Sequence, residues 1–330
     1  MTTRVWVPQP VGFHAAATSS SIATWIEDLR QALLDVGLVQ TADTGQFNAG
    51  TFAWTAPGDL DGRSSEVTYM MFRFDDTLQS TAPIFIRIGI LAACGSATAG
   101  YQLGSSVEVG SATNGAGAIT AGSSGAKTFF LGYPNYGPSS TTPDAYQSYA
   151  AFSAARGFCG VVFNAGGRNV YSTSYWAIYS PLKFCVERIP DISGTPTAEG
   201  YSLWANSQGR NGSWSRYGDS NYYDVLTQQV TTVLFGSGVA SRDNLHSIPY
   251  VGSVAAVSPD MFCAHGFHLT PEPVRANGIL AYPQGRIAHG TEFDLRVYGT
   301  SDSHFIAMDY RAAMRPCAAT TAADFAFLWE

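Results

Sequence analysis

Charged side chains are scarce in this chain of 330 residues, of which 13% are Asp, Glu, Lys or Arg. Typical soluble domains carry about 25%. Lysine occurs only at positions 127 and 183, the net charge is −7, and no window contains a block of basic residues. Because binding to phosphates requires clustered Lys and Arg, these absences argue against a nucleic-acid-binding protein and against a polybasic membrane anchor.

Long apolar runs are absent as well. No stretch reaches the roughly 18 apolar residues that a transmembrane helix needs, so we expect no membrane contact. The first residues, Met1–Pro8, contain no apolar segment of the kind found in secretory signals. We therefore expect the chain to be made in the cytoplasm.

Cysteines are few and widely spaced, and no Cys-x-x-Cys motif occurs. An odd number without that motif indicates neither a zinc ribbon nor a redox pair. We expect buried free thiols, the usual state of cysteine in a reducing compartment. The five residues are Cys94, Cys159, Cys185, Cys263 and Cys317.

The motifs of the common enzyme classes are missing. The chain has no GxSxG, no GxGxxG after a strand and no GxxxxGK[ST]. The segment 59–62, Asp-Leu-Asp-Gly, resembles the start of a calcium loop but lacks the later ligands, so it predicts a turn. We therefore expect a protein that is not an enzyme and that needs no cofactor.

One group of metal-binding residue types occurs late in the chain, at Cys263, His265, His268 and Glu272. On a strand, Cys263 and His265 would share a face while His268 would lie on the other. A helix is opposed by the neighbouring Pro271. Because zinc requires several converging ligands, we expect no metal site here.

Scattered carboxylates leave one enzymatic alternative open. A polysaccharide-degrading enzyme would need two of them to face each other across a groove, and sequence alone does not measure that separation. The candidates are Asp75, Asp76, Glu199, Asp219 and Asp224.

A single helix is predicted over residues 20–36. Its apolar residues recur at intervals of three and four and form one stripe. The run 18–21, Thr-Ser-Ser-Ser, offers N-caps, and Gly37 stands where a left-handed C-cap is expected. The stripe consists of Ile22, Trp25, Leu29, Leu33 and Val36.

After residue 36 the apolar pattern changes to a period of two, which is typical of strands. We predict a mainly β fold: an antiparallel β-sandwich or distorted barrel with one packed N-terminal helix, plus a second β-rich region. The segments expected to contain strands are 51–55, 67–74, 83–90, 101–103, 107–109, 127–131, 150–163, 176–188, 226–235, 293–298 and 304–308. The apolar segment 325–330 is expected to be docked on the protein rather than frayed.

A change of composition suggests a domain boundary. Residues 189–196, Ile-Pro-Asp-Ile-Ser-Gly-Thr-Pro, have the chemistry of a turn or linker. We divide the chain into an N-terminal helix plus β domain, 1–190, and a β-rich C-terminal region, 191–330. One compact domain is the alternative.

Two stretches, 133–149 and 201–223, combine aromatic residues with Ser, Gly and Asn, a composition found in adaptable binding loops. Such aromatics can pack in the interior, lie between subunits, or stack on a host glycan. We select them as candidate contacts for a partner or a receptor. The residues are Tyr133, Tyr136, Tyr146, Trp204, Trp214, Tyr217, Tyr222 and Tyr223.

Several segments resemble uncharacterised virion structural proteins of tailed bacteriophages. They are Trp25–Leu29, Gly37–Thr41, Glu66–Tyr69, Phe72–Ile88, Arg296–Gly299 and Ala326–Glu330, and the Gly/Ser/Thr-rich middle is similar in style. The resemblance covers about half of the chain. It implies a role in the virion, at the tail or baseplate, and it transfers no catalytic residue.

Together these features lead to one main expectation. The chain is expected to be a structural component of a tailed-phage virion that assembles as a symmetric homo-oligomer with other virion proteins. A surface with few charges is less costly to desolvate in repeated contacts. The alternatives are a receptor-binding protein for a host glycan and a decoration protein attached to the neck or capsid.

Overall fold

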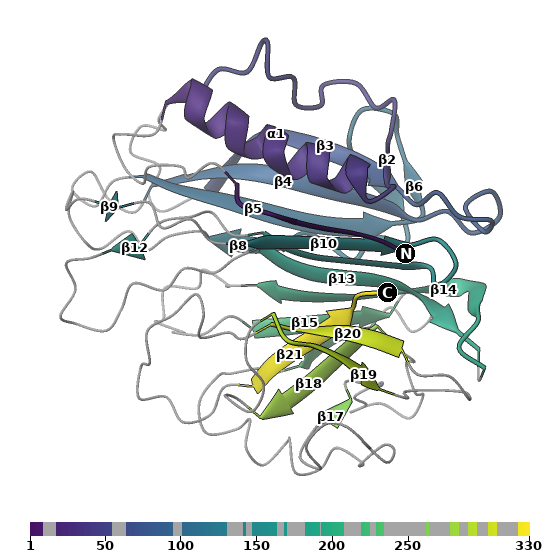
Figure 1. Cartoon of the computed structure of the whole chain (residues 1–330). Coiled ribbons are helices and arrows are strands. Elements are labelled where there is room, and N and C mark those ends of the chain that lie inside the picture. The colour runs from purple at the N-terminus through teal and green to yellow at the C-terminus, as the bar shows by residue number, and fades with distance from the viewer. Residues whose placement is uncertain are drawn as a thin grey trace.

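The protein is mainly β, with one helix and antiparallel sheets that remain open in the part of the chain that the structure describes (Figure 1). This confirms the predicted fold class. The computed structural model describes residues 1–8, 18–54, 64–94, 101–130, 141–142, 147–163, 168–169, 182–191, 193–207, 219–224, 229–233, 262–263, 278–283, 290–295, 303–308 and 323–330.

The helix α1 (Ser19–Asp35) confirms the prediction for residues 20–36. A capping box starts it: the Thr18 hydroxyl accepts from the Ser21 amide at 3.1 Å, and the Ser21 hydroxyl accepts from the Thr18 amide at 3.0 Å. Gly37, with a φ of +106°, follows the last turn. The predicted stripe is buried in full, from Ile22 to Val36.

A five-stranded sheet, here called the helix-side sheet, follows α1 in the chain. Its strand order is β2-β3-β4-β5-β8. Ile86, Ile88 and Ile90 alternate along β4 and are all buried, as the period-two pattern predicted. The strands are β2 (Val39–Gln40), β3 (Ser64–Arg73), β4 (Phe85–Cys94), β5 (Tyr101–Gly110) and β8 (Lys127–Phe130).

A seven-stranded sheet, here called the central sheet, has the order β1-β10-β11-β13-β14-β15-β16. Every residue of β10 and β11 is buried, because both faces of this sheet are covered. The strands are β1 (Thr2–Trp6), β10 (Ser148–Ser153), β11 (Phe158–Phe163), β13 (Leu182–Pro190), β14 (Pro196–Ser207), β15 (Asp219–Asp224) and β16 (Gln229–Val233).

A third sheet, the C-terminal sheet, has the order β17-β18-β21-β20-β19 and lies below the central sheet in Figure 1. The strands predicted at 293–298 and 304–308 are present in part as β19 and β20, which pair antiparallel. The strands are β17 (Phe262–Cys263), β18 (Ile279–Pro283), β19 (Glu292–Leu295), β20 (Ser303–Met308) and β21 (Ala323–Leu328). Two ribbons pair β6 (Ala112–Thr113) with β7 (Ile119–Ala121), and β9 (Thr141–Thr142) with β12 (Arg168–Asn169).

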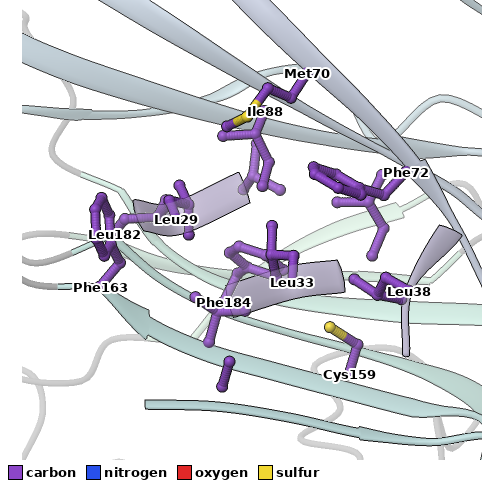
Figure 2. Packing of buried hydrophobic residues seen from close by; sticks show 14 of the residues in the cluster. Leu29, Leu33, Leu38, Met70, Phe72, Ile88, Cys159, Phe163, Leu182 and Phe184 are labelled. Carbon is purple, nitrogen blue, oxygen red and sulfur yellow. The ribbon is translucent and has the colours of Figure 1, made fainter. Parts of the chain in front are cut away.

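The main core lies between the helix-side and central sheets. Figure 2 shows Leu29 and Leu33 of α1 between Met70 of β3 and Phe184 of β13. The Trp25 ring lies 4.7 Å from that of Phe163 on β11. The helix therefore completes the sandwich by filling the space between its two sheets.

The C-terminal sheet packs on the other face of the central sheet. The Gly278 amide donates to the buried Glu187 carboxylate at 2.9 Å. A Cβ on Gly160 would lie 2.9 Å from the Phe327 ring, so the two layers are in close contact. The Trp329 ring meets Tyr149 edge-on at 5.9 Å and is buried, as expected for a docked C-terminal segment.

Two local expectations need correction. Residues 51–55 were predicted as a strand, but the described residues 51–54 join no sheet: the Trp54 amide donates to the Ser19 hydroxyl at 2.8 Å, and the Phe52 amide to Asn48 O at 2.9 Å. Residues 101–103 and 107–109, predicted as two strands, belong to the continuous β5.

The proposed boundary at residue 190 falls at a hairpin. Pro190 of β13 pairs with Pro196 of β14, and Asp191 accepts hydrogen bonds within the turn between them. The turn chemistry expected for 189–196 is thus present. The central sheet contains strands from both sides of residue 190, and the division into two domains stays a prediction.

Candidate functional site

Three of the eight predicted contact residues lie in described strands. Trp204 and Tyr222 are direct cross-strand partners on β14 and β15, and Tyr223 pairs with Leu203. The fold therefore brings together two aromatic positions that are 18 residues apart in sequence. The others lie outside the described residues: Tyr133, Tyr136, Tyr146, Trp214 and Tyr217.

The hydrolase alternative gains little from the carboxylates that the structure describes. Asp219 and Asp224 stand at opposite ends of β15, so their backbones are about 17 Å apart. Glycosidase carboxyl groups lie about 5–9.5 Å apart. Asp76 is already paired with Arg188. The Asp75 Oδ1 atom lies 3.8 Å from Arg73 Nη1.

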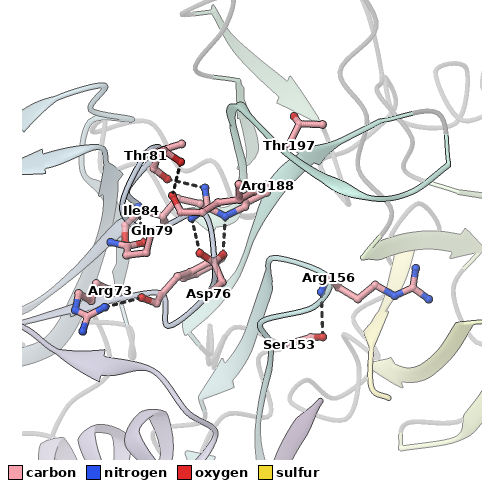
Figure 3. A network of polar contacts seen from close by, with 12 residues as sticks. Arg73, Asp76, Gln79, Thr81, Ile84, Ser153, Arg156, Arg188 and Thr197 are labelled. Carbon is pink, nitrogen blue, oxygen red and sulfur yellow. Dashed lines mark hydrogen bonds and ion pairs between the residues drawn. The ribbon is translucent and has the colours of Figure 1, made fainter.

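Arg188 and Asp76 form the most deeply buried ion pair of the described residues (Figure 3). The Arg188 Nε and Nη2 atoms donate to the two Asp76 carboxylate oxygens at 2.6 and 2.9 Å, and Nη1 donates to Ala82 O at 2.6 Å. The guanidinium carbon lies 5.8 Å from the centre of the Phe74 ring. This pair joins β13 to the turn that links β3 and β4.

A second polar cluster is centred on Asp43. Its carboxylate accepts from the Thr41 hydroxyl at 2.7 Å, the Gly117 amide at 3.0 Å and the Thr113 hydroxyl at 3.3 Å. Desolvation raises the pKa of Asp43, but these hydrogen bonds outweigh it and leave the pKa below its ordinary value. The cluster ties the segment after β2 to the β6–β7 ribbon.

Beside it, Arg87 of β4 makes a similar connection. Its Nη1 donates to Glu66 Oε2 at 2.7 Å, its Nε donates to Gly117 O at 2.5 Å, and its guanidinium carbon lies 4.8 Å from the centre of the Tyr69 ring. The Tyr69 hydroxyl donates to Thr44 O. These contacts hold β3 and β4 to each other and to the neighbouring turns.

A third cluster lies on the C-terminal sheet. The two ring nitrogens of His304 on β20 lie 2.7 Å from Asp294 Oδ1 and 3.1 Å from Glu292 Oε2, both on β19. The hydrogen bond to Asp294 raises the pKa of His304, desolvation opposes it, and Glu292 adds to the increase. Protonation of His304 thus strengthens the contact between β20 and β19.

Cys159 and Cys185 are poor nucleophiles. Cys159 and Cys185 are free and buried, as expected. Burial raises the pKa of both thiols, and for Cys185 the neighbouring Cys159 and Glu187 add to the increase. The described ranges contain no group of three or more His, Cys, Asp or Glu that could bind a metal ion. Of the Cys263 group, only Cys263 itself is described, on β17; the other members lie outside these ranges.

The edge strand β1 is a surface that the sequence analysis did not single out. Met1, Val5 and Val7 are the exposed large apolar residues of the described chain, at 37%, 46% and 51%. On the opposite face, the Trp6 ring stacks on Phe163 at 6.0 Å. The β-branched and aromatic run that ends before Pro8 is the signal that would have predicted this strand.

Comparisons with known proteins identify no relative. No protein-family model matches the chain, and neither a curated protein nor a solved structure matches it. Within the described residues, no helix is long and apolar enough to cross a membrane.

Proposed function

We propose that this protein is a structural component of a tailed-bacteriophage virion, located at the tail tip or baseplate and assembled as a symmetric homo-oligomer. The scarcity of charge carries the proposal: 13% of residues are charged, about half the usual share. Few charges have to be desolvated when such a surface is buried repeatedly in a ring or spike.

The polar clusters are consistent with a passive building block. Arg188–Asp76, the Asp43 cluster and the Arg87 contacts each join elements of the fold to one another. The Cys159 and Cys185 thiols are buried and have raised pKa values. The resemblance of segments such as Phe72–Ile88 to virion proteins of tailed phages points to the same role.

Cryo-electron microscopy of purified virions, made by the phage that encodes this chain, tests the proposal. A symmetric ring or spike on the tail, with density that fits the central and helix-side sheets, is the expected result. Absence of the chain from the particle, checked by mass spectrometry of the same virions, contradicts it.

Recognition of a host glycan is the second candidate. The pairing of Trp204 with Tyr222 favours it, because adjacent aromatic positions on two strands suit stacking on a sugar. A glycan array with the isolated protein is the test. Saccharide binding that is lost in Trp204→Ala, with an unchanged circular dichroism spectrum, would support it, whereas the structural role alone predicts no binding.

A further inference from the structure

The exposed large apolar side chains of the described residues gather in and beside one strand. Val5 of β1 and Val7, which directly follows the strand, are separated by two positions and are both exposed, so they lie on the same side of this extended segment. Trp6 lies on the other face and packs on Phe163 inside the sandwich. The strand is therefore anchored through one face and presents valines to solvent on the other.

The strand also has an open side. All five of its residues pair with β10, from Thr2 with Phe152 to Trp6 with Ser148, and no other described strand pairs with it. In an antiparallel ladder, alternate residues direct their N–H and C=O groups away from the neighbouring strand. The outer side of β1 thus offers backbone donors and acceptors in the geometry that an added strand requires.

Several of the usual protections of an edge strand are missing from the described residues of β1. Soluble proteins block such edges with Lys, Pro, bulges or inward charges. Residues 2–6 contain neither Lys nor Pro, the first proline is Pro8 beyond the strand, and the β1–β10 register has no bulge. The one charged side chain of β1, Arg4, is paired with Asp35 at the end of α1.

We propose that β1 pairs with β1 of a second copy of this chain, antiparallel and about a twofold axis, so that two central sheets join into one. An antiparallel pair of identical strands is self-complementary, as a twofold interface requires. Because Arg4 is paired with Asp35, no unpaired charged side chain of β1 opposes the approach of two copies, although each chain carries a net charge of −7. Val5 and Val7 of the two copies then cover one another.

The contact is small. Two edges of about six residues bury less than the roughly 1,600 Å² of a standard interface, so the dimer should depend on concentration. Within a virion, the high local concentration of copies would favour it. The pairing itself does not rest on the virion role and can be tested on the purified chain.

Sedimentation velocity of the full chain over a hundredfold range of concentration is the test. The wild type should shift from monomer to dimer, and Val5→Lys/Val7→Lys should remain monomeric throughout. Both valines are exposed, so circular dichroism should show the same fold. The double variant changes the net charge from −7 to −5, which reduces general repulsion, so loss of the dimer would reflect the edge itself.

A matched control is Ala116→Lys/Ala198→Lys, which makes the same change in charge at two exposed positions away from β1. It should dimerise like the wild type. Hydrogen exchange gives a second measure: backbone amides of residues 2–7 should gain protection as the wild type is concentrated.

A wild type that stays monomeric, or a dimer that persists in the valine variant, would overturn the proposal. If the wild type stays monomeric, the strand that pairs with the β1 edge would have to come from a different protein. Either result is distinguishable from failure of the virion role, which is decided by whether the chain is present in particles.

Discussion

Arg188 and Asp76, which are 112 positions apart, form a two-point ion pair whose side chains are only 1% and 2% exposed. The pair connects the end of β13 to the turn between β3 and β4, so it links the two sheets of the sandwich. A third donor of the same guanidinium bonds Ala82 O. Its geometry is therefore well satisfied, as a buried charge requires.

Breaking this pair should be strongly destabilising. Asp76→Asn leaves the buried Arg188 charge without its carboxylate, and we expect a loss of about 3–5 kcal/mol in the free energy of unfolding. Urea denaturation measures it. The matched control is Asp75→Asn, which removes the exposed partner of Arg73 and should lose at most about 1 kcal/mol. Equal losses in the two variants would show that the Arg188–Asp76 ion pair does not hold the two sheets together.

His304 should make the C-terminal sheet sensitive to pH. Its carboxylate partners raise its pKa, so their stabilisation is fully present below the ordinary value of 6.5 and is lost as the pH rises through the higher value of the folded protein. The melting temperature should fall over that interval, with more exchange of amides in β19 and β20. His304→Gln should flatten this response; an unchanged pH profile would show that the cluster contributes nothing.

The Tyr201 hydroxyl should contribute to the contact between the two sheets. It is buried on β14 and lies 2.7 Å from Val109 O on β5, with Gly122 O as a second acceptor. Tyr201→Phe removes this donor while Val109 O still accepts from the Ser124 amide at 2.8 Å, so we expect a loss of about 0.5–1.5 kcal/mol. Tyr149→Phe is the control, because that hydroxyl meets the side chain of the exposed Gln147, which can turn to water. A similar loss in both variants would argue against a special role for Tyr201.

Much of the fold could be predicted because its signals are local. The Thr18 cap, the stripe from Ile22 to Val36 and Gly37 define α1, and alternation along Ile86–Ile90 defines β4. Residues 51–55 have the same strand-like composition, yet the Ser19 hydroxyl binds the Trp54 amide. A tertiary contact therefore decided that segment, and composition could not show it.

The site was harder to predict, because it depends on which elements meet. Asp76 was considered as a hydrolase candidate, and only the fold places Arg188 against it. Aromatic content drew attention to loops, whereas the exposed large apolar side chains of the described residues lie in and beside β1. Whether Val5 is buried is set by the position of its strand at the edge of the sheet. That position follows from the pairing of β1 with β10, more than 140 residues away in sequence.

Gly157 gives a further test of the role of the Arg188–Asp76 ion pair. Its φ is +57°, and a Cβ would lie 2.8 Å from Arg188 Cγ and 2.9 Å from Cδ. Gly125 has a similar φ of +65°, but nothing lies within 4 Å of its Cβ position. Ala at either site incurs about 1–2 kcal/mol for the left-handed backbone, so only Gly157→Ala should also displace the Arg188 stem.

The difference between the two Ala variants therefore measures the second effect alone. Gly157→Ala should be more destabilising than Gly125→Ala in urea denaturation. In the Asp76→Asn background this difference between the two Ala variants should shrink. The reason is that Arg188 has already lost its ion pair with Asp76, so displacing the Arg188 side chain breaks no further ion pair. An excess that is the same with and without the Asp76 carboxylate would mean that Gly157 only relieves crowding. An excess that disappears would mean that Gly157 is needed to let Arg188 reach across the sandwich.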